Sequence, residues 1–202
     1  GNGAVANQTS NNTATLNDKT IPAISSVSLA ADNSFIDVTF GEGVFDTNGG
    51  AGALETGDFA LPISGGTATS PSVTSVTTTG GAGLSGGETT IRVNFSVTGS
   101  VSGAETLEVD LTDGTSVFDA AGNAAVANQT SNNTASMNDK TAPVFSSVSP
   151  SSSSAVANAN VGYTLSEAVA SGKVTFTRTG GTADGSSPHE VTLTGTELNS
   201  GT

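Results

Sequence analysis

The stretch AVANQTSNNTA occurs twice in this chain of 202 residues, at positions 4–14 and again at positions 125–135. The match extends beyond it, because residues 1–29 and 122–150 differ at only seven of 29 positions when aligned with a fixed offset of 121. Self-similarity at a constant period is typical of tandem arrays, and a period of this length suits a whole small domain. The repeat therefore predicts three parts: the end of one unit over 1–20, a complete unit over 21–141 and the front half of a further unit over 142–202.

Composition and residue alternation both predict β-structure. Gly, Ser, Thr and Asn are abundant, whereas strong helix formers are scarce. In the run TTIRVNFSV, apolar Ile91, Val93 and Phe95 alternate with polar residues, as in a strand with one buried face. We expect strands at 24–29, 35–40, 58–63, 73–79, 90–97, 105–112 and 126–136, and then at 144–148, 161–165, 174–179 and 191–194. Seven short strands in one repeat predict an all-β, two-sheet sandwich, and its core should include Ile91, Val93, Phe95, Leu107 and Val109.

Charge and composition argue against a nucleic-acid partner, a membrane span and any site that needs cysteine. With 18 acidic and five basic residues the net charge is −13, so a nucleic-acid partner is not expected, because phosphate binding needs Lys and Arg. No stretch approaches the roughly 18 apolar residues of a membrane span, and no signal-peptide pattern is visible in the sequence. The chain has no cysteine, which excludes disulfides and thiolate metal sites.

Catalysis is not expected either. The one histidine, His189, stands beside a proline in SSPHEVTL, and there is no cysteine or second histidine to share a metal or activate a nucleophile. We expect it to be a solvated turn residue. The many acidic residues leave a pair of catalytic carboxylates, as in glycosidases, as a formal alternative. However, the chain has one tyrosine and no tryptophan on which a sugar could stack.

Several motifs carry a family resemblance. They are FGEGVFD at 40–46, LSEAV at 165–169, VFDAAGN at 117–123 and the NDKT linkers at 17–20 and 138–141. Their order resembles that of the bacterial immunoglobulin-like modules found in tandem in large surface and secreted proteins. The resemblance implies immunoglobulin-like β-sandwich repeats, one complete and two partial, and an extracellular or cell-surface location. The family form has Ser-Glu at the centre of the first motif; Ser166 keeps this serine, whereas Gly41 replaces it.

Acidic residues should gather at one end of the complete unit. Where sandwich strands alternate in direction, the preceding linker and the loops that follow the second and sixth strands meet at one pole. Seven carboxylates fall there: Asp18, Glu42, Asp46, Glu55, Asp58, Asp113 and Asp119. Crowded carboxylates raise one another's pKa, and a Ca²⁺ ion, which takes roughly six to eight oxygen ligands, relieves the repulsion. Two interpretations stay open: the carboxylates are solvated on loops, or they bind a junctional calcium ion, with Asp18, Glu42, Asp46 and Asp119 as candidate ligands.

Two functions are compatible with these features. The first is a non-catalytic structural repeat of an extracellular bacterial filament or adhesin stalk, which links end to end with neighbouring repeats. The second is an adhesion module that recognises a glycan or protein through its loops. Near-identical repeats favour the first function, because they imply a task that many copies share. The second function would be favoured by a cluster of aromatic residues on loops, and the sequence shows none.

The half-unit over 142–202 raises one more expectation. It should leave inward-facing apolar residues without a complete opposing sheet, namely Val161, Tyr163, Leu165, Val174 and Phe176. Open strand edges pair readily with other chains, so residues 1–20 of one chain could complete the half-unit of the next by strand addition, which would build a filament. The alternative is that both ends are cuts through one continuous polypeptide.

Overall fold

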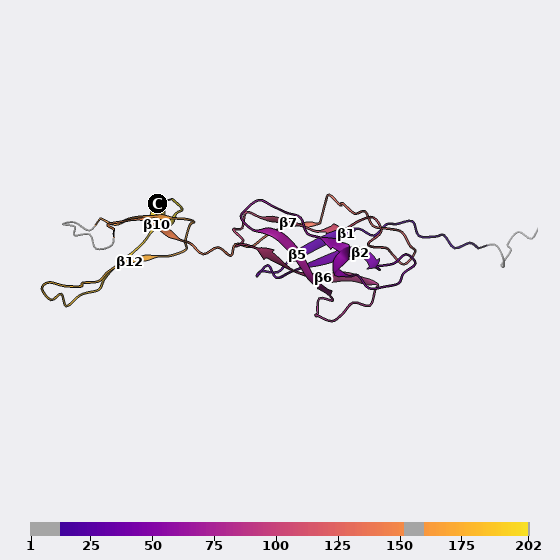
Figure 1. Ribbon diagram of the computed structural model, residues 1–202, viewed down its shortest axis with the longest axis horizontal. Helices are drawn as coiled ribbons and strands as arrows, with labels where there is room; N and C mark the ends of the chain where they lie inside the picture. The colour runs from indigo at the N-terminus through magenta and orange to yellow at the C-terminus, as the bar shows by residue number, and fades with distance from the viewer. Residues whose placement is uncertain (1–12, 152–159, 202) are drawn as a thin grey trace, which may run out of the picture. The chain divides into compact units, whose positions relative to one another are not determined.

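The computed structural model describes residues 13–151 and 160–201. The chain divides between Lys140 and Thr141 into two compact units (Figure 1). Most of the predicted segment 1–20 lies outside the described residues. Both units consist of β-strands, and the helical structure in the described part is limited to two 3₁₀ turns, η1 (Thr56–Asp58) and η2 (Gly195–Leu198). The all-β prediction is confirmed.

The first unit contains a four-stranded antiparallel sheet in the order β1-β2-β6-β5. Its strands are β1 (Ile24–Leu29), β2 (Phe35–Val44), β6 (Glu88–Thr98) and β5 (Thr69–Thr77). Strict alternation along β2 and β6 places one set of side chains inside and the other outside. On the outer face Asp37 lies opposite Arg92 and accepts two hydrogen bonds from its guanidinium, at 2.8 and 2.9 Å.

The remaining strands of this unit are shorter. Strand β3 (Phe59–Ala60) pairs with β8 (Asp110–Leu111), and β7 (Thr106–Glu108) lies between β4 (Ile63–Ser64) and β9 (Thr134–Ser136).

These short strands correct three predictions. The strand expected over 58–63 begins with η1 and is broken at Pro62, which has no N–H to donate to a ladder. The strand expected over 105–112 is interrupted at Val109, whose N–H donates to the carbonyl of Asn133. The strand expected over 126–136 forms only at β9, because side chains in the preceding stretch hydrogen-bond to its own backbone: Asn133 donates to the carbonyl of Gln129, and Gln129 donates to the carbonyl of Ser131.

One cluster of apolar side chains forms the core of the first unit. It draws on both the four-stranded sheet and the short strands, and all five predicted core residues are buried in it: Ile91, Val93, Phe95, Leu107 and Val109. The strands expected over 24–29, 35–40 and 90–97 are confirmed, and the latter two extend further than expected. The alternation of apolar and polar residues therefore predicted the inner faces of β2, β6 and β7 correctly.

A buried carboxylate joins two loops of this unit. Glu105 accepts hydrogen bonds from the backbone N–H groups of Thr67 and Ala68, at 2.7 and 2.9 Å, and from the N–H of Ser102, at 2.9 Å. Burial by itself would raise the pKa of Glu105, but these bonds outweigh it and lower the pKa from 4.5 to about 2. A Cβ at Gly66 would overlap the carboxylate, which explains why a glycine makes this turn.

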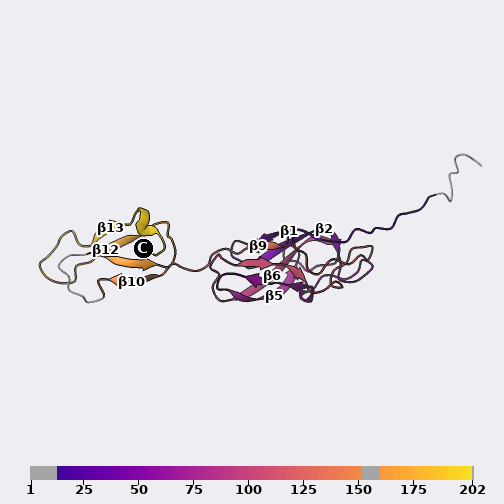
Figure 2. The same ribbon diagram turned by 90° about the horizontal axis from the view of Figure 1, so that it is seen from above.

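The second unit contains two separate pairs of strands. Strand β10 (Phe145–Ser149) pairs with β11 (Gly162–Leu165), and β12 (Lys173–Phe176) pairs with β13 (His189–Thr192). Figure 2 shows β10, β12 and β13 from above. All four predicted strands are present, with ends shifted by at most three residues. Its described apolar side chains are mostly exposed or half-buried, and only Leu165 and Leu193 are buried.

We predict that Phe95→Ala lowers the free energy of unfolding of the first unit by about 3–5 kcal/mol, because it leaves a cavity in a close-packed core. Urea unfolding followed by circular dichroism measures the loss. The same truncation at exposed Phe145 should leave the first unit's transition unchanged. Equal stability of the wild-type chain and Phe95→Ala would show that the inner face of β6 is wrongly assigned.

A second prediction concerns acid stability. The folded pKa of Glu105 lies below its unfolded value of 4.5, so its contribution to stability is complete above that value and is lost as the pH falls toward about 2. At neutral pH Glu105→Gln should be less stable than the wild type, and the difference should shrink as the pH falls to about 3. Urea titrations of both proteins at each pH give this difference. A difference that does not depend on pH would contradict the assignment.

Candidate functional site

The loop VFDAAGN contains a buried carboxylate that is held by one asparagine. Asp119 is fully buried, and its two oxygens accept hydrogen bonds from the backbone N–H and the side-chain Nδ2 of Asn123, both at 2.7 Å. Burial would raise the pKa of Asp119, but these bonds and the N–H groups of Ala121 and Gly122 outweigh it and lower the pKa. Asp119 is therefore a buried anion at one end of the first unit.

The same asparagine reaches the linker that precedes the unit. Nδ2 of Asn123 lies 3.0 Å from the carbonyl oxygen of Thr20 and 3.3 Å from that of Asp18. Within the linker, the N–H of Thr20 donates to Oδ1 of Asp18 at 2.9 Å. One side chain thus connects the VFDAAGN loop with the NDKT linker, although the two are more than 100 positions apart in sequence.

Three of the four candidate metal ligands come together here. One carboxylate oxygen each of Asp18, Glu42 and Asp119 lies within 4.8 Å of the other two, and this is the one such acidic group in the described part of the chain. Burial raises the pKa of Glu42, and the charges of Asp119 and Asp18 raise it further. The three acidic residues, called the acidic trio below, are therefore crowded enough to disfavour one negative charge.

The fourth candidate ligand, Asp46, does not join the acidic trio. Its N–H donates to the carbonyl of Gly52, in the turn that follows β2. Asp46 belongs instead to a second acidic group around Asp58. Burial raises the pKa of Asp58, a hydrogen bond from the N–H of Glu55 opposes this, and the charges of Asp46, Glu55 and Asp113 add to the increase.

The acidic trio suits a hard cation better than a reaction. Its ligand atoms are all carboxylate oxygens, the kind of ligand that hard cations such as Ca²⁺ take, and they lie within 4.8 Å of one another. Both oxygens of Asp119 already accept a hydrogen bond from Asn123, so water or backbone carbonyls would have to supply the remaining ligands of a bound ion.

A second linker is held at the opposite end of the first unit. Asn33, in the turn after β1, donates from Nδ2 to the carbonyl of Asn138 at 2.7 Å and accepts from the N–H of Asn138 at 3.0 Å. The N–H of Lys140 donates to the carbonyl of Val101 at 2.7 Å. Asn138 belongs to the NDKT motif at 138–141, but its partner Asn33 could not be identified from the sequence, because it does not stand out in an asparagine-rich chain.

A third amide side chain caps the edge of β1. Gln129 accepts from the N–H of Ile24 at 2.8 Å and donates to the carbonyl of Ile24 at 2.5 Å, so it copies the pairing of a neighbouring strand. Asn123, Asn33 and Gln129 are the functional residues that sequence reasoning missed. In the repeat, Asn123 and Gln129 have identical counterparts, Asn2 and Gln8, which was the only available signal.

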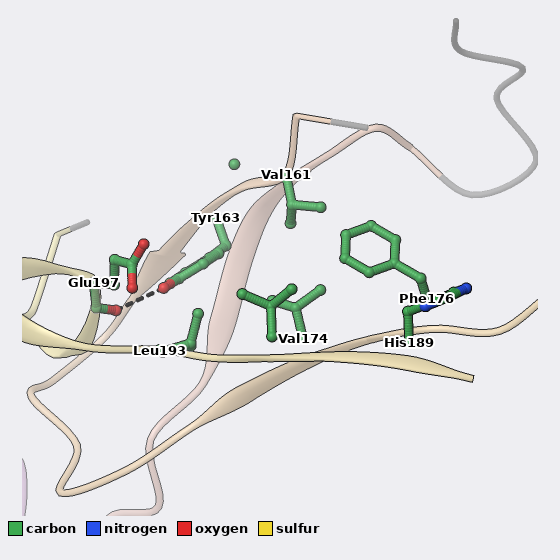
Figure 3. Close-up of a pocket in the computed structure, with 9 residues that line it drawn as sticks. Val161, Tyr163, Val174, Phe176, His189, Leu193 and Glu197 are labelled. Carbon is green, nitrogen blue, oxygen red and sulfur yellow. Dashed lines mark hydrogen bonds between the residues drawn. The ribbon is translucent and has the colours of Figure 1, made fainter. Parts of the chain in front are cut away.

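The second unit contains an apolar groove between its two pairs of strands, with a volume of about 730 Å³. Figure 3 shows Val161 and Tyr163 of the β11 segment facing Val174 and Leu193, with Phe176 at one end. The hydroxyl of Tyr163 donates to the carbonyl of Glu197 at 2.6 Å. The groove agrees with the expectation for Val161, Tyr163, Val174 and Phe176, which line it without a complete opposing sheet among the described residues. Leu165 was expected with them but is buried, at 2% exposure.

His189 lies beside this groove, exposed at the start of a strand. It is the first residue of β13, and its Nε2 lies 2.7 Å from a carboxylate oxygen of Asp184. Both side chains are substantially exposed, so the pair sits in water at the rim of the groove.

Comparison with family models, with curated proteins and with solved structures gave no significant match to this chain. In the part of the chain that the structure describes, no helix has the length and apolar character needed to cross a membrane.

Proposed function

We propose that this chain is a non-catalytic structural repeat of an extracellular bacterial filament or adhesin stalk, built from immunoglobulin-like β-sandwich units that link end to end. The observation that carries the proposal is that the first unit holds the linkers at both of its ends through side-chain amides. A spacer needs this arrangement, because a free linker would let neighbouring units swing independently.

A sandwich architecture is supported by the shared core. Apolar residues of β2 and β6 pack with residues of β3, β7 and β8 in one cluster. The resemblance of the FGEGV, VFDAAGN and NDKT motifs to bacterial immunoglobulin-like modules supports the subtype and the extracellular location.

The two linker contacts lie at opposite ends of β1. Asn123 contacts the linker that leads into β1, whereas Asn33 lies just after β1 and contacts the linker that follows β9. A tensile force applied through the two linkers would therefore act on the unit along the direction of its strands. Gln129 joins β1 to the stretch before β9, so the first and last segments of the unit are also fastened to each other.

The acidic trio is the proposed calcium site of this arrangement. Asp18 belongs to the linker, whereas Glu42 and Asp119 belong to the body of the unit. An ion bound by all three would tie the linker to the unit at the same place as Asn123. It would also remove the repulsion that raises the pKa of Glu42.

The proposal predicts that Asn123→Ala frees the linker before β1. The variant loses the hydrogen bonds to the carbonyls of Asp18 and Thr20, so heteronuclear NOE values of amides 16–20 in the full chain should fall clearly below those of the wild type. Asn128→Ala is the matched control, because Asn128 is exposed in the same part of the chain. Unchanged NOE values in Asn123→Ala would refute a linker held by the unit.

A further prediction addresses the metal. Millimolar Ca²⁺ should raise the thermal midpoint of the first unit above its value in chelator, since binding to the folded state alone is stabilising. Glu42→Gln should raise the midpoint in chelator, because it removes a disfavoured charge, and should reduce the response to Ca²⁺.

Asp32→Asn is the control for this experiment, because Asp32 lies in the turn at the other end of β1 and should leave the response intact. If the wild-type midpoint is the same in Ca²⁺ and in chelator, the acidic trio is a solvated cluster and binds no calcium.

A further inference from the structure

The loop that follows β2 contains the dipeptide Asn48-Gly49 in a small closed turn. The N–H and the Oγ1 of Thr47 both donate to the carbonyl of Ala51, at 2.9 and 2.7 Å, and they close the turn at its base. Asn48 and Gly49 are both exposed at its tip. The dipeptide is therefore fixed in place at the base of the turn but remains open to water.

Neither reactive group of this dipeptide has a hydrogen-bond partner. Among the described residues, no hydrogen bond is made by the side-chain amide of Asn48 or by the N–H of Gly49. By contrast, the side-chain amides of Asn33, Asn123 and Asn133 all donate to backbone carbonyls. Asn48 is also the one asparagine in the described part of the chain that precedes a glycine. It thus combines a free amide with a neighbour that has no side chain.

These conditions allow an asparagine side chain to react with the backbone. Hydroxide removes the N–H proton of Gly49, the nitrogen forms a bond with Cγ of Asn48, and the side-chain nitrogen takes a proton from water and leaves as ammonia. Water then opens the cyclic imide at one of its two carbonyl groups, which gives aspartate or isoaspartate. One water is consumed and one ammonia is released, with no oxidant or cofactor. Glycine hinders the attack least, because it has no Cβ and a freely adjustable backbone.

The turn lies against the VFDAAGN loop. A Cβ on Gly122 would overlap Oδ1 of Asn48, and a Cβ on Gly50 would lie 3.1 Å from Cα of Ala120, so glycines on both loops allow this close contact. The N–H of Gly122 is also one of the donors that lower the pKa of Asp119. The side chain at position 48 and the buried anion Asp119 therefore both contact Gly122.

We propose that Asn48 is a site of spontaneous deamidation in the folded chain, and that its product places a new negative charge against the VFDAAGN loop. The amide of Asn48 is neutral, whereas either product has a carboxylate beside Gly122. Repulsion between this carboxylate and Asp119 destabilises the end of the unit to which Asn123 binds the linker. The reaction itself does not depend on the proposed spacer function.

Ageing the full chain in water labelled with heavy oxygen tests the reaction. Opening of the imide leaves one heavy oxygen in the product, and a tryptic digest in ordinary water then locates it, since deamidation during the digest adds no label. Cleavage after Lys19 and Arg92 releases residues 20–92, in which Asn48 and the hydrogen-bonded Asn33 are the two asparagines. Label should accumulate at Asn48, faster in alkaline than in neutral buffer. The fragment 93–140, whose asparagines precede residues other than glycine, should stay unlabelled.

Asn48→Ser is the matched control for this reaction. Asn48 is exposed and does not have a positive φ, so serine fits the turn, and residues 20–92 of the variant should stay unlabelled. A free peptide of residues 44–53 is aged in parallel until it is labelled, which sets the duration of the experiment. If Asn48 of the folded chain is unlabelled at that time, or if 93–140 gains as much label as 20–92, the proposal is wrong.

The effect of the new charge is tested with Asn48→Asp, which reproduces one of the two products. In chelator and at low salt it should lower the thermal midpoint of the first unit, and added salt should shrink the difference because it screens the repulsion. Asn128→Asp adds the same charge at an exposed side chain without a hydrogen bond among the described residues, and should stay closer to the wild type. Equal midpoints for the two variants would overturn the proposed effect on the VFDAAGN loop. The linker contact itself is tested separately by Asn123→Ala.

Discussion

The first unit depends on how the open edge of β1 is satisfied. An edge strand presents backbone N–H and C=O groups that must find partners or water. At Ile24 the partner is the side chain of Gln129, which makes both hydrogen bonds of a neighbouring strand without being one. This contact closes the unit, because it joins the first strand to the stretch that leads into the last. The amides of Asn123 and Asn33 then hold the linkers at the two ends of the same strand.

Electrostatics at the two ends of β1 differ in kind. At the start of β1, Asp119 is a buried anion satisfied by hydrogen bonds, and it lies close enough to Glu42 and Asp18 to raise the pKa of Glu42. At the end of β1, neutral amides pair with each other and with backbone carbonyls. Only the acidic end would therefore respond to a divalent cation, whereas the contact between Asn33 and Asn138 should not depend on metal.

Sequence reasoning succeeded where alternation was long and one-sided. Strands β2 and β6 were predicted because their apolar residues follow a period of two over six or more positions. The short strands were predicted too long, since a proline at 62 and local side-chain hydrogen bonds break the ladders in ways that hydrophobic patterning does not reveal. Chain topology placed Asp18, Glu42 and Asp119 together as expected, whereas Asp46, which was expected with them, is not part of this group. The amides were missed because an Asn that pairs with backbone looks the same in sequence as a solvated one.

Amide hydrogen exchange at two equivalent positions tests the central claim most directly. In the full chain the N–H of Ile24 donates to Gln129. Phe145 follows its NDKT linker at the same distance as Ile24, and among the described residues its strand β10 pairs with β11 alone. We predict that Ile24 is protected from exchange by at least about a hundredfold relative to Phe145, and that Gln129→Ala removes most of this difference. Equal exchange at Ile24 and Phe145 in the wild-type chain would show that Gln129 does not close the edge of β1, and the account of the unit as a linked spacer would lose its structural basis.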